Sequence, residues 1–393
     1  MVFNKERAYK VMRDNDIDAL ILSNPENVTY VSGFPPLLKC TYERRLCVII
    51  PLEGSGTIIL RTSFIGLHNS ANSWIEDIRV YGDSGIIIPP GLNENNLSFT
   101  ERNIADALAK EGRTYVDVVI DVLREKGLTK AFLGFDKCAY DCIGEEVSKK
   151  LPKAKVDLAS KIVENIRLVK TEKEIELLKK AASINERGIK AILDEIAVGK
   201  TEIELENVYN SKIREEGAEP HFSNILGGSR GALVNDFPSN YTLKRGDPVR
   251  IDVDCIYNYY FSDIARSAVL GKSNEHFKKY YNALYIGLER AKEIIKPGIE
   301  PCAILETAIN SVRKAGIPNY KRFMIGHALG LDCYDGLLIS SAENRLLEEN
   351  MVFSLELMYY ELGLGCPHLE DTILVTNTGF KSLQTLGMEL YEI

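Results

Sequence analysis

The sequence has no long apolar run and no segment of the signal-peptide type at its N-terminus. Its apolar stretches all fall well short of the ~20 residues that a membrane-spanning helix needs. The first residues, Met-Val-Phe-Asn-Lys-Glu-Arg, lead directly into a polar helical pattern rather than an apolar core. We therefore expect a cytoplasmic protein that does not associate with membranes.

Closely spaced cysteines are also missing. The eight cysteines are scattered, and none forms a CxxC pair. A chain of 393 residues with 45% hydrophobic residues buries enough apolar surface to fold without disulfides. Reduced thiols in a reducing compartment are therefore expected.

Positive charge is not in excess anywhere along the chain. The formal net charge is −8, and no run of five or six like charges occurs. A protein that binds nucleic acid or an anionic membrane needs a basic stripe, so neither class is expected. The length instead predicts a globular protein of two or three domains.

The first domain, residues 1–160, alternates helical and strand patterns, which predicts an α/β architecture. Asn24-Pro25 ends the first apolar run with turn chemistry. Residues 102–126 predict one or two helices, and residues 86–96 a surface loop. Four short apolar runs predict buried strands, at residues 18–22, 46–51, 56–60 and 131–135.

The second domain, residues 161–393, separates helices from strands, which predicts an α+β fold. Thr171 with Glu174, and Thr201 with Glu204, are capping boxes that begin two long helices. Residues 249–270 are rich in Val, Ile, Tyr and Phe and predict an antiparallel hairpin. Residues 274–316 return to helix, and residues 351–376 to strand.

Acidic residues lie inside the strands predicted for this second domain. Asp252 and Asp254 are two residues apart and so share one face of a strand. Asp263 follows across the expected turn, where the hairpin could return it beside Asp252. Carboxylates among aromatic and branched residues are costly unless they are paired, protonated or bound to a metal.

Three more candidate residues follow along the chain. His327 lies in an apolar run between Gly326 and Gly330, and Glu356 and Glu370 lie in two strand-like segments. Each signal is weak alone, since a histidine in an apolar run is most often a core residue and an acid on a strand usually faces solvent. Their occurrence together, in this order, matches a known pattern.

That pattern resembles the pita-bread metallohydrolase family, which includes prolidase, aminopeptidase P, methionine aminopeptidase and creatinase. The resemblance covers nearly the whole chain and is greatest to the two-domain prolidase and aminopeptidase P branch. It implies a creatinase-like N-terminal domain and a pita-bread catalytic domain. The segments that carry it are Asp18 to Ile21, Pro25 to Phe34, Arg167 with Lys170, Glu174 to Ala182, Asp263 to Arg266, Gly326 to Gly330, Glu356 and Glu370-Asp371.

The resemblance also implies roles for five residues that would hold two divalent metal ions. Asp252 would bind one ion and His327 with Glu356 the other, while Asp263 and Glu370 would bridge the two. Such an oxygen-rich set suits Mn²⁺ best, with Co²⁺, Fe²⁺ or Zn²⁺ as alternatives. A water held by both metals would be the nucleophile, with Glu356 and His327 as the catalytic side chains.

Several supporting residues of the family are replaced. Two histidines of the prolidase pattern are Asn235 and Tyr334 here, and an arginine is His368. A glycine is Asp254, which either adds a carboxylate near the metals or points away at a bulge, and a proline is Leu357. We expect Asn235, Tyr334, His368 and Asp254 to contact the substrate. Asn235 and Tyr334 can donate hydrogen bonds but cannot act as acids near pH 7.

Three functions are therefore weighed. The first is an Xaa-Pro dipeptidase or aminopeptidase that acts on short peptides as a homodimer. The second is a creatinase-like hydrolase of small amides or amidines, motivated by the loss of both histidines. The third is a non-catalytic binding protein of the same fold, against which the complete ligand set counts. His221 is a candidate to replace a lost histidine, although an ordinary loop histidine is the simpler interpretation.

Overall fold

The computed structural model describes residues 2–35, 45–71, 73–82, 84–93, 95, 97–108 and 112–393. The chain forms two compact units, Met1–Arg167 and Leu168–Ile393. The division expected after residue 160 falls where α8 (Ser160–Leu168) begins, whereas the units separate near the end of that helix. Cys40 and residues 94 and 96 of the expected loop lie outside the described residues.

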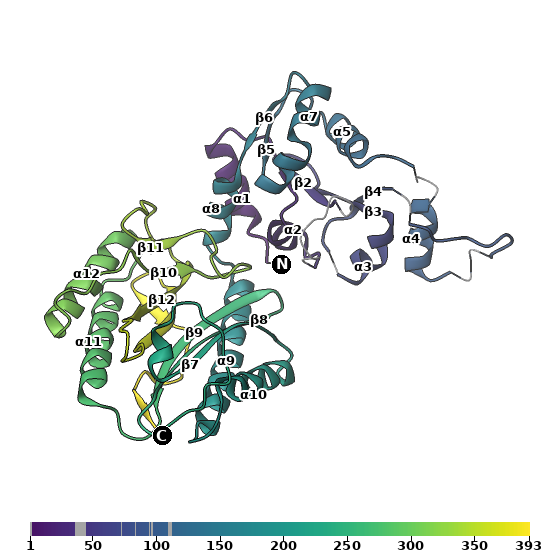
Figure 1. Ribbon diagram of the computed structural model, residues 1–393. Coiled ribbons are helices and arrows are strands. Elements are labelled where there is room, and N and C mark those ends of the chain that lie inside the picture. Colours follow the sequence, from purple (N-terminus) through teal and green to yellow (C-terminus); the bar gives the residue numbers. More distant parts are fainter. Residues whose placement is uncertain are drawn as a thin grey trace. The chain divides into compact units, whose positions relative to one another are not determined.

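The N-terminal unit is built on a mixed six-stranded sheet of order β4-β3-β2-β1-β5-β6 (Figure 1). The strands are β1 (Ala19–Leu22), β2 (Cys47–Pro51), β3 (Thr57–Arg61), β4 (Asp77–Tyr81), β5 (Phe132–Phe135) and β6 (Lys155–Leu158). The four strands expected from apolar runs are confirmed. The sequence did not predict β4 and β6, because both lie at sheet edges and carry few buried apolar side chains.

Eight α-helices occur in the described part of this unit. Besides α8 they are α1 (Lys5–Asp14), α2 (Pro25–Ser32), α3 (Ile65–Ser70), α4 (Phe99–Leu108), α5 (Tyr115–Glu125), α6 (Lys137–Ala139) and α7 (Glu145–Lys150). The turn expected at Asn24-Pro25 is instead the start of α2. The Asn24 side chain accepts hydrogen bonds from two N–H groups of the first turn, and Pro25 stands where a missing N–H costs nothing.

The C-terminal unit contains two sheets. One has the order β15-β9-β8-β7 and the other β11-β10-β12-β13-β14. The strands are β7 (Glu219–Gly227), β8 (Pro248–Tyr257), β9 (Tyr260–Val269), β10 (Met324–Ala328), β11 (Leu338–Ser340), β12 (Val352–Met358), β13 (His368–Val375), β14 (Phe380–Ser382) and β15 (Tyr391–Glu392).

Two helix pairs cover the outer faces of these sheets. Helices α9 (Glu172–Glu195) and α10 (Glu202–Glu215) pack on β7 to β9, and α11 (Glu275–Lys292) and α12 (Pro301–Ala315) pack on the other sheet. Figure 1 shows the pairs on opposite sides of the unit with strands between them. Both predicted capping boxes are present. The expected α/β and α+β fold classes are confirmed.

The alternation of side chains along the strands determines which residues face the space between the two sheets. On β8, the side chains of Val249, Ile251, Val253 and Cys255 belong to the core under α9 and α10. The alternate residues of β8 therefore face the second sheet, because successive side chains in a strand point to opposite faces. On β12, Phe353, Leu355 and Leu357 likewise pack toward α11 and α12, and Glu356 faces the other way. No helix in the described part of the chain is long and apolar enough to cross a membrane.

Candidate metal centre

The hairpin of β8 and β9 fixes the position of three carboxylates. Its two-residue turn, Asn258-Tyr259, has positive φ at both positions, 46° and 72°. The resulting register pairs Asp254 with Asp263, and Asp252 with Ala265. Asp263 is therefore the diagonal neighbour of Asp252. A carboxylate oxygen of each lies within 4.8 Å of the other, which confirms that the hairpin returns Asp263 beside Asp252.

The second sheet brings a histidine and two glutamates to the same region. His327 on β10 lies opposite Ser354 on β12, and Glu356 lies opposite Glu370 on β13. Gly326 allows this close pairing, because a Cβ there would lie only 2.0 Å from the Ser354 carbonyl oxygen.

Gly330, on the other side of His327, has a different role. A Cβ at this position would lie 1.8 Å from a carboxylate oxygen of Asp335. Asp335 forms a buried ion pair with Lys170, at 2.8 Å between Nζ and Oδ2. The glycine therefore leaves room for a structural ion pair beneath the histidine segment.

The ligand-type atoms converge in two overlapping groups. In one, a carboxylate oxygen from each of Asp252, Asp263 and Glu370 lies within 4.8 Å of the others. In the second, Asp263, His327 and Cys333 meet the same criterion. Asp263 belongs to both groups, as a residue that bridges two ions would.

A backbone contact fixes the orientation of His327. Its Nδ1 lies 2.7 Å from the carbonyl oxygen of Cys333. A carbonyl can only accept, so Nδ1 carries a proton and Nε2 is the ring nitrogen left to bind a cation. Nε2 lies 3.3 Å from Oδ2 of Asp263, which is the direction a shared metal ion would require.

His368 lies behind the cluster rather than at an open surface. Its side chain is fully buried, with Nε2 at 3.2 Å from Oε2 of Glu356 and Nδ1 at 3.3 Å from Nε of Arg250. Because the Arg250 Nε–H can only donate, His368 accepts at Nδ1 and donates from Nε2 to Glu356. Arg250 also donates to Asp252 at 2.6 Å. His368 thus holds Glu356 and Arg250 in position, and the substrate contact expected from the sequence stays a prediction.

The buried acids are strongly perturbed. Burial, and then the charge of neighbouring carboxylates, raises the pKa of Asp263 and of Glu370 well above the usual range. Burial raises the pKa of Asp254 to about 7. Oε1 of Glu370 accepts a hydrogen bond from Ser354, whereas its buried Oε2 has no hydrogen-bond partner among the described residues. Clustered acids with an orphaned oxygen suit divalent cations, so the donor set fits a metal centre.

Glu356 behaves differently from its neighbours. Burial would raise its pKa, but the hydrogen bond and charge of His368, together with the charge of His327, lower it overall. Burial would lower the pKa of His327, but its hydrogen bond to Asp263 and the charges of Asp263 and Glu356 raise it. The pKa of Glu356 is therefore shifted in the opposite direction to those of Asp254, Asp263 and Glu370.

The remaining candidates take separate positions. Asp254 is buried and points into the cluster, with Oδ2 at 3.4 Å from Nδ1 of His221. The Tyr334 ring stacks on the His327 ring, with centroids 4.0 Å apart. Asn235 is exposed, with φ 58°, in the loop after the 3₁₀ turn η4 (Gly228–Ala232).

Two residues of the cluster were not identified from the sequence. Arg250 stands two positions before Asp252, so strand alternation could have placed it on the same face. Cys333 was counted only as one of the scattered cysteines. Its position six residues after His327 was the only indication in the sequence. The turn that brings its thiol to the acids follows no periodic pattern, so this indication was not enough.

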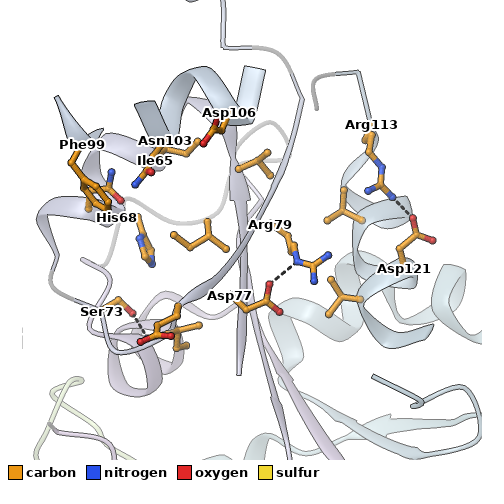
Figure 2. A pocket seen from close by; sticks show the side chains of 17 residues that line it. Ile65, His68, Ser73, Asp77, Arg79, Phe99, Asn103, Asp106, Arg113 and Asp121 are labelled. Carbon is orange, nitrogen blue, oxygen red and sulfur yellow. Dashed lines mark hydrogen bonds and ion pairs between the residues drawn. The ribbon is translucent and has the colours of Figure 1, made fainter. Parts of the chain in front are cut away.

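A cavity of about 890 Å³ lies elsewhere, in the N-terminal unit (Figure 2). Its walls come from α3, β4, α4 and α5. Figure 2 shows Arg79 paired with Asp77, and Arg113 with Asp121. Each of these arginines is paired with a carboxylate, and both groups of metal-ligand side chains lie in the C-terminal unit and not in this cavity.

Two family models match the chain. The model described as metallopeptidase family M24 matches residues 176–377, and that of the creatinase/prolidase N-terminal domain matches residues 5–169. The chain is 28% identical to a protein named Xaa-Pro dipeptidase from Pyrococcus furiosus, over 98% of each chain. It is equally identical to the protein of that name from Pyrococcus horikoshii, over 98% of this chain and 97% of that protein.

Solved structures of similar fold cover both units. A prolidase from Pyrococcus horikoshii has a TM-score of 0.78 at 27% identity, covering 98% of this chain and 99% of that one. An X-Pro aminopeptidase from Thermotoga maritima has a TM-score of 0.79, covering 99% of each chain, and at 23% identity it shows the fold alone.

Proposed function

The chain belongs to metallopeptidase family M24, and we propose that it hydrolyses short peptides at Xaa-Pro bonds with two divalent cations. The observation that carries the proposal is the convergence of buried acids and His327 from two sheets, with one oxygen of Glu370 left without a partner. The names of the relatives, Xaa-Pro dipeptidase and prolidase, support the proline-type substrate.

In the proposed site, Asp252 would hold one cation, and His327 with Glu356 the other. Asp263 and Glu370 would be shared by both, and Asp263 belongs to both ligand groups. The five residues alone form an oxygen-rich set that favours Mn²⁺. Bound there, the cations supply an activated water and a Lewis acid for the scissile carbonyl.

The protein's own side chains provide the remaining chemistry. Glu356, which accepts a hydrogen bond from His368 and whose pKa that contact lowers, would be the carboxylate that takes up a proton at the centre. The Tyr334 hydroxyl, beside the His327 ring, donates a hydrogen bond to the developing oxyanion. His221 is half exposed at the edge of the cluster, where it takes the place of a lost histidine near the leaving amine.

The test is a peptide panel assayed with protein loaded with Mn²⁺ or Co²⁺. Xaa-Pro dipeptides are expected to be cleaved, with Xaa-Ala dipeptides slower and with no turnover after chelation. Glu356→Gln should lower kcat by about 10²–10⁴-fold. Glu293→Gln serves as the matched control, because Glu293 is exposed and its carboxylate pairs with Arg290. Inert peptides together with turnover of a compact amide would reject the peptidase in favour of a creatinase-like hydrolase.

Location and assembly belong to the same proposal. The described cysteines are all free, which agrees with a cytoplasmic protein. A homodimer is proposed from the resemblance to the two-domain branch. Size-exclusion chromatography with light scattering checks it, and a monomeric mass in the active preparation would rule it out.

A further inference from the structure

Two ligand-type side chains at the cluster have no role in the proposed function. Asp254 directly faces Asp263 across the hairpin of β8 and β9. The thiol of Cys333 lies between their carboxylates, with Sγ at 3.5 Å from Oδ2 of Asp254 and at 3.7 Å from Oδ2 of Asp263. Both acids are buried and Cys333 is half-buried, so this thiol lies at the edge of the metal centre.

The backbone of Cys333 is fixed by the same contacts that fix His327. Its carbonyl accepts the Nδ1 proton of His327, and the next residues are held by a backbone hydrogen bond from Asp335 to Ala328 at 2.8 Å. The thiol therefore has a set position relative to the imidazole. Sγ, a carboxylate oxygen of Asp263 and a ring nitrogen of His327 all lie within 4.8 Å of one another.

The thiol contacts the two carboxylates at the long distances typical of sulfur. A divalent cation at this place would take the sulfur as a thiolate ligand, because a coordinating thiol is deprotonated outright. The orphaned oxygen of Glu370 is an independent indication that a ligand belongs at this cluster.

We propose that Cys333 and Asp254 are additional ligands of the cation on the His327 side. Sγ bonds to the ion and its proton leaves to solvent, giving a mixed sulfur, nitrogen and oxygen set. A thiolate favours Zn²⁺, Fe²⁺ or Co²⁺ over Mn²⁺, so the two positions of the centre differ in metal preference. This inference rests on the metal-binding part of the proposed function and is independent of the peptide substrate.

Co²⁺ titration of the metal-free protein tests the inference by absorption spectroscopy. The native protein should develop a near-ultraviolet thiolate-to-cobalt charge-transfer band that Cys333→Ser lacks and Cys302→Ser retains. Cys302 is the matched control because it lies on α12, where its thiol contacts Glu300. Asp254→Asn should keep the band and weaken binding of one Co²⁺ by about 10-fold or more.

The outcomes separate the two proposals. Two Co²⁺ bound without a thiolate band in the native protein overturns this inference and leaves the proposed function standing. A band that survives in Cys333→Ser also overturns it. Absence of any Co²⁺ binding overturns both proposals. The presence or absence of the thiolate band is first measured on the native protein. A variant that fails to fold therefore does not decide the result.

A competition experiment gives a second readout. Cys333→Ser should lower the affinity for Zn²⁺ by about 10-fold or more while changing that for Mn²⁺ much less. Equal losses for both metals would show that the substitution damages the site in general, and would reject a sulfur ligand.

Discussion

Arg250 connects two parts of the metal centre through a single guanidinium group. It donates to Asp252 from one nitrogen and to His368 from another, and His368 in turn donates to Glu356. Asp252 and Glu356 are proposed ligands of different cations. One buried arginine therefore couples the geometry of both positions.

Replacing this arginine tests the coupling. Arg250→Gln should weaken Mn²⁺ binding by about 10–100-fold, because residues that orient metal ligands contribute effects of that size. The Mn²⁺ affinity of Arg250→Lys should lie between those of the native protein and Arg250→Gln, since lysine keeps the charge but lacks the planar guanidinium group. Isothermal titration of the metal-free proteins measures the affinities, and an unchanged affinity in Arg250→Gln would show that Arg250 has no positioning role.

At the scale of residues, the sequence predicted the metal ligands, because they occur in motifs of fixed order along the chain. The pattern pointed to Asp252, Asp263, His327, Glu356 and Glu370, and the structure brings Asp252, Asp263, His327 and Glu370 into the two ligand groups, with Glu356 paired across from Glu370. The positions of Arg250, His368 and Cys333 depend on contacts between segments about 80 to 120 residues apart, which no local pattern encodes.

Among the elements, helices α11 and α12 pack closely together on the sheet that contains β12. Gly287 on α11 faces α12, and a Cβ there would lie 2.3 Å from Cγ2 of Val312 and 3.1 Å from the Ala308 carbonyl oxygen. The missing side chain thus allows the two helices to pack closely above β12, since the same Cβ would also lie 3.1 Å from Leu357.

Gly287→Ala should therefore destabilise the C-terminal unit. Alanine gains about 1 kcal/mol of helix propensity, but overpacking of this kind costs about 1–3 kcal/mol, and the contact with backbone oxygen cannot relax by a rotamer change. Urea unfolding followed by circular dichroism measures the change. Gly66→Ala on α3, where a new Cβ meets nothing within 4 Å, is the control that should lose no stability.

The start of α9 carries an acid that opposes folding at neutral pH. Burial raises the pKa of Glu174 to about 7, from 4.5 in an unfolded chain. Between these values the folded state holds a proton that the unfolded state has released, so the contribution of Glu174 to stability falls as pH rises. Its side chain also completes the capping box with Thr171.

Glu174→Gln keeps the amide oxygen for the capping box and removes the titration. From pH 5.5 to 7.5 the variant should gain about 2 kcal/mol relative to the native protein. Chemical unfolding of both proteins, without metal, at the two pH values gives this difference. A difference that does not change with pH would mean that Glu174 titrates near its ordinary value when folded.

Elements with their own local signal were the ones that the sequence could place. Capping boxes fixed the starts of α9 and α10, and apolar runs fixed the inner strands of the first sheet. The edge strands β4 and β6 carried too few apolar residues to be found. The short strand β10 was missed because its register shifts between Met324 and His327, which breaks the period of two.

All the proposed metal ligands belong to one of the two units of the whole molecule. Trp74, the single tryptophan, belongs to the other, where its ring N–H donates to the Val31 carbonyl at 2.6 Å. Tryptophan fluorescence therefore reports on the N-terminal unit alone, whereas circular dichroism reports on both.

Metal should stabilise the two units unequally. A cation at 100 times its dissociation constant adds about 2.7 kcal/mol to the unit that binds it. We expect Mn²⁺ to raise the unfolding midpoint of the C-terminal unit by circular dichroism and to leave the Trp74 transition unchanged. Equal shifts in both signals would indicate that the units unfold as one.

The two-residue turn between β8 and β9 limits how this protein can change over evolutionary time. Substitution at position 252, 254 or 263 alters one donor and leaves the others in place. Insertion of one residue at Asn258-Tyr259 would shift the pairing by one and turn the carboxylate of Asp263 toward the helix-covered core. Changes of residue type can therefore adjust the metal chemistry gradually, whereas a change of length in this turn removes it in one step.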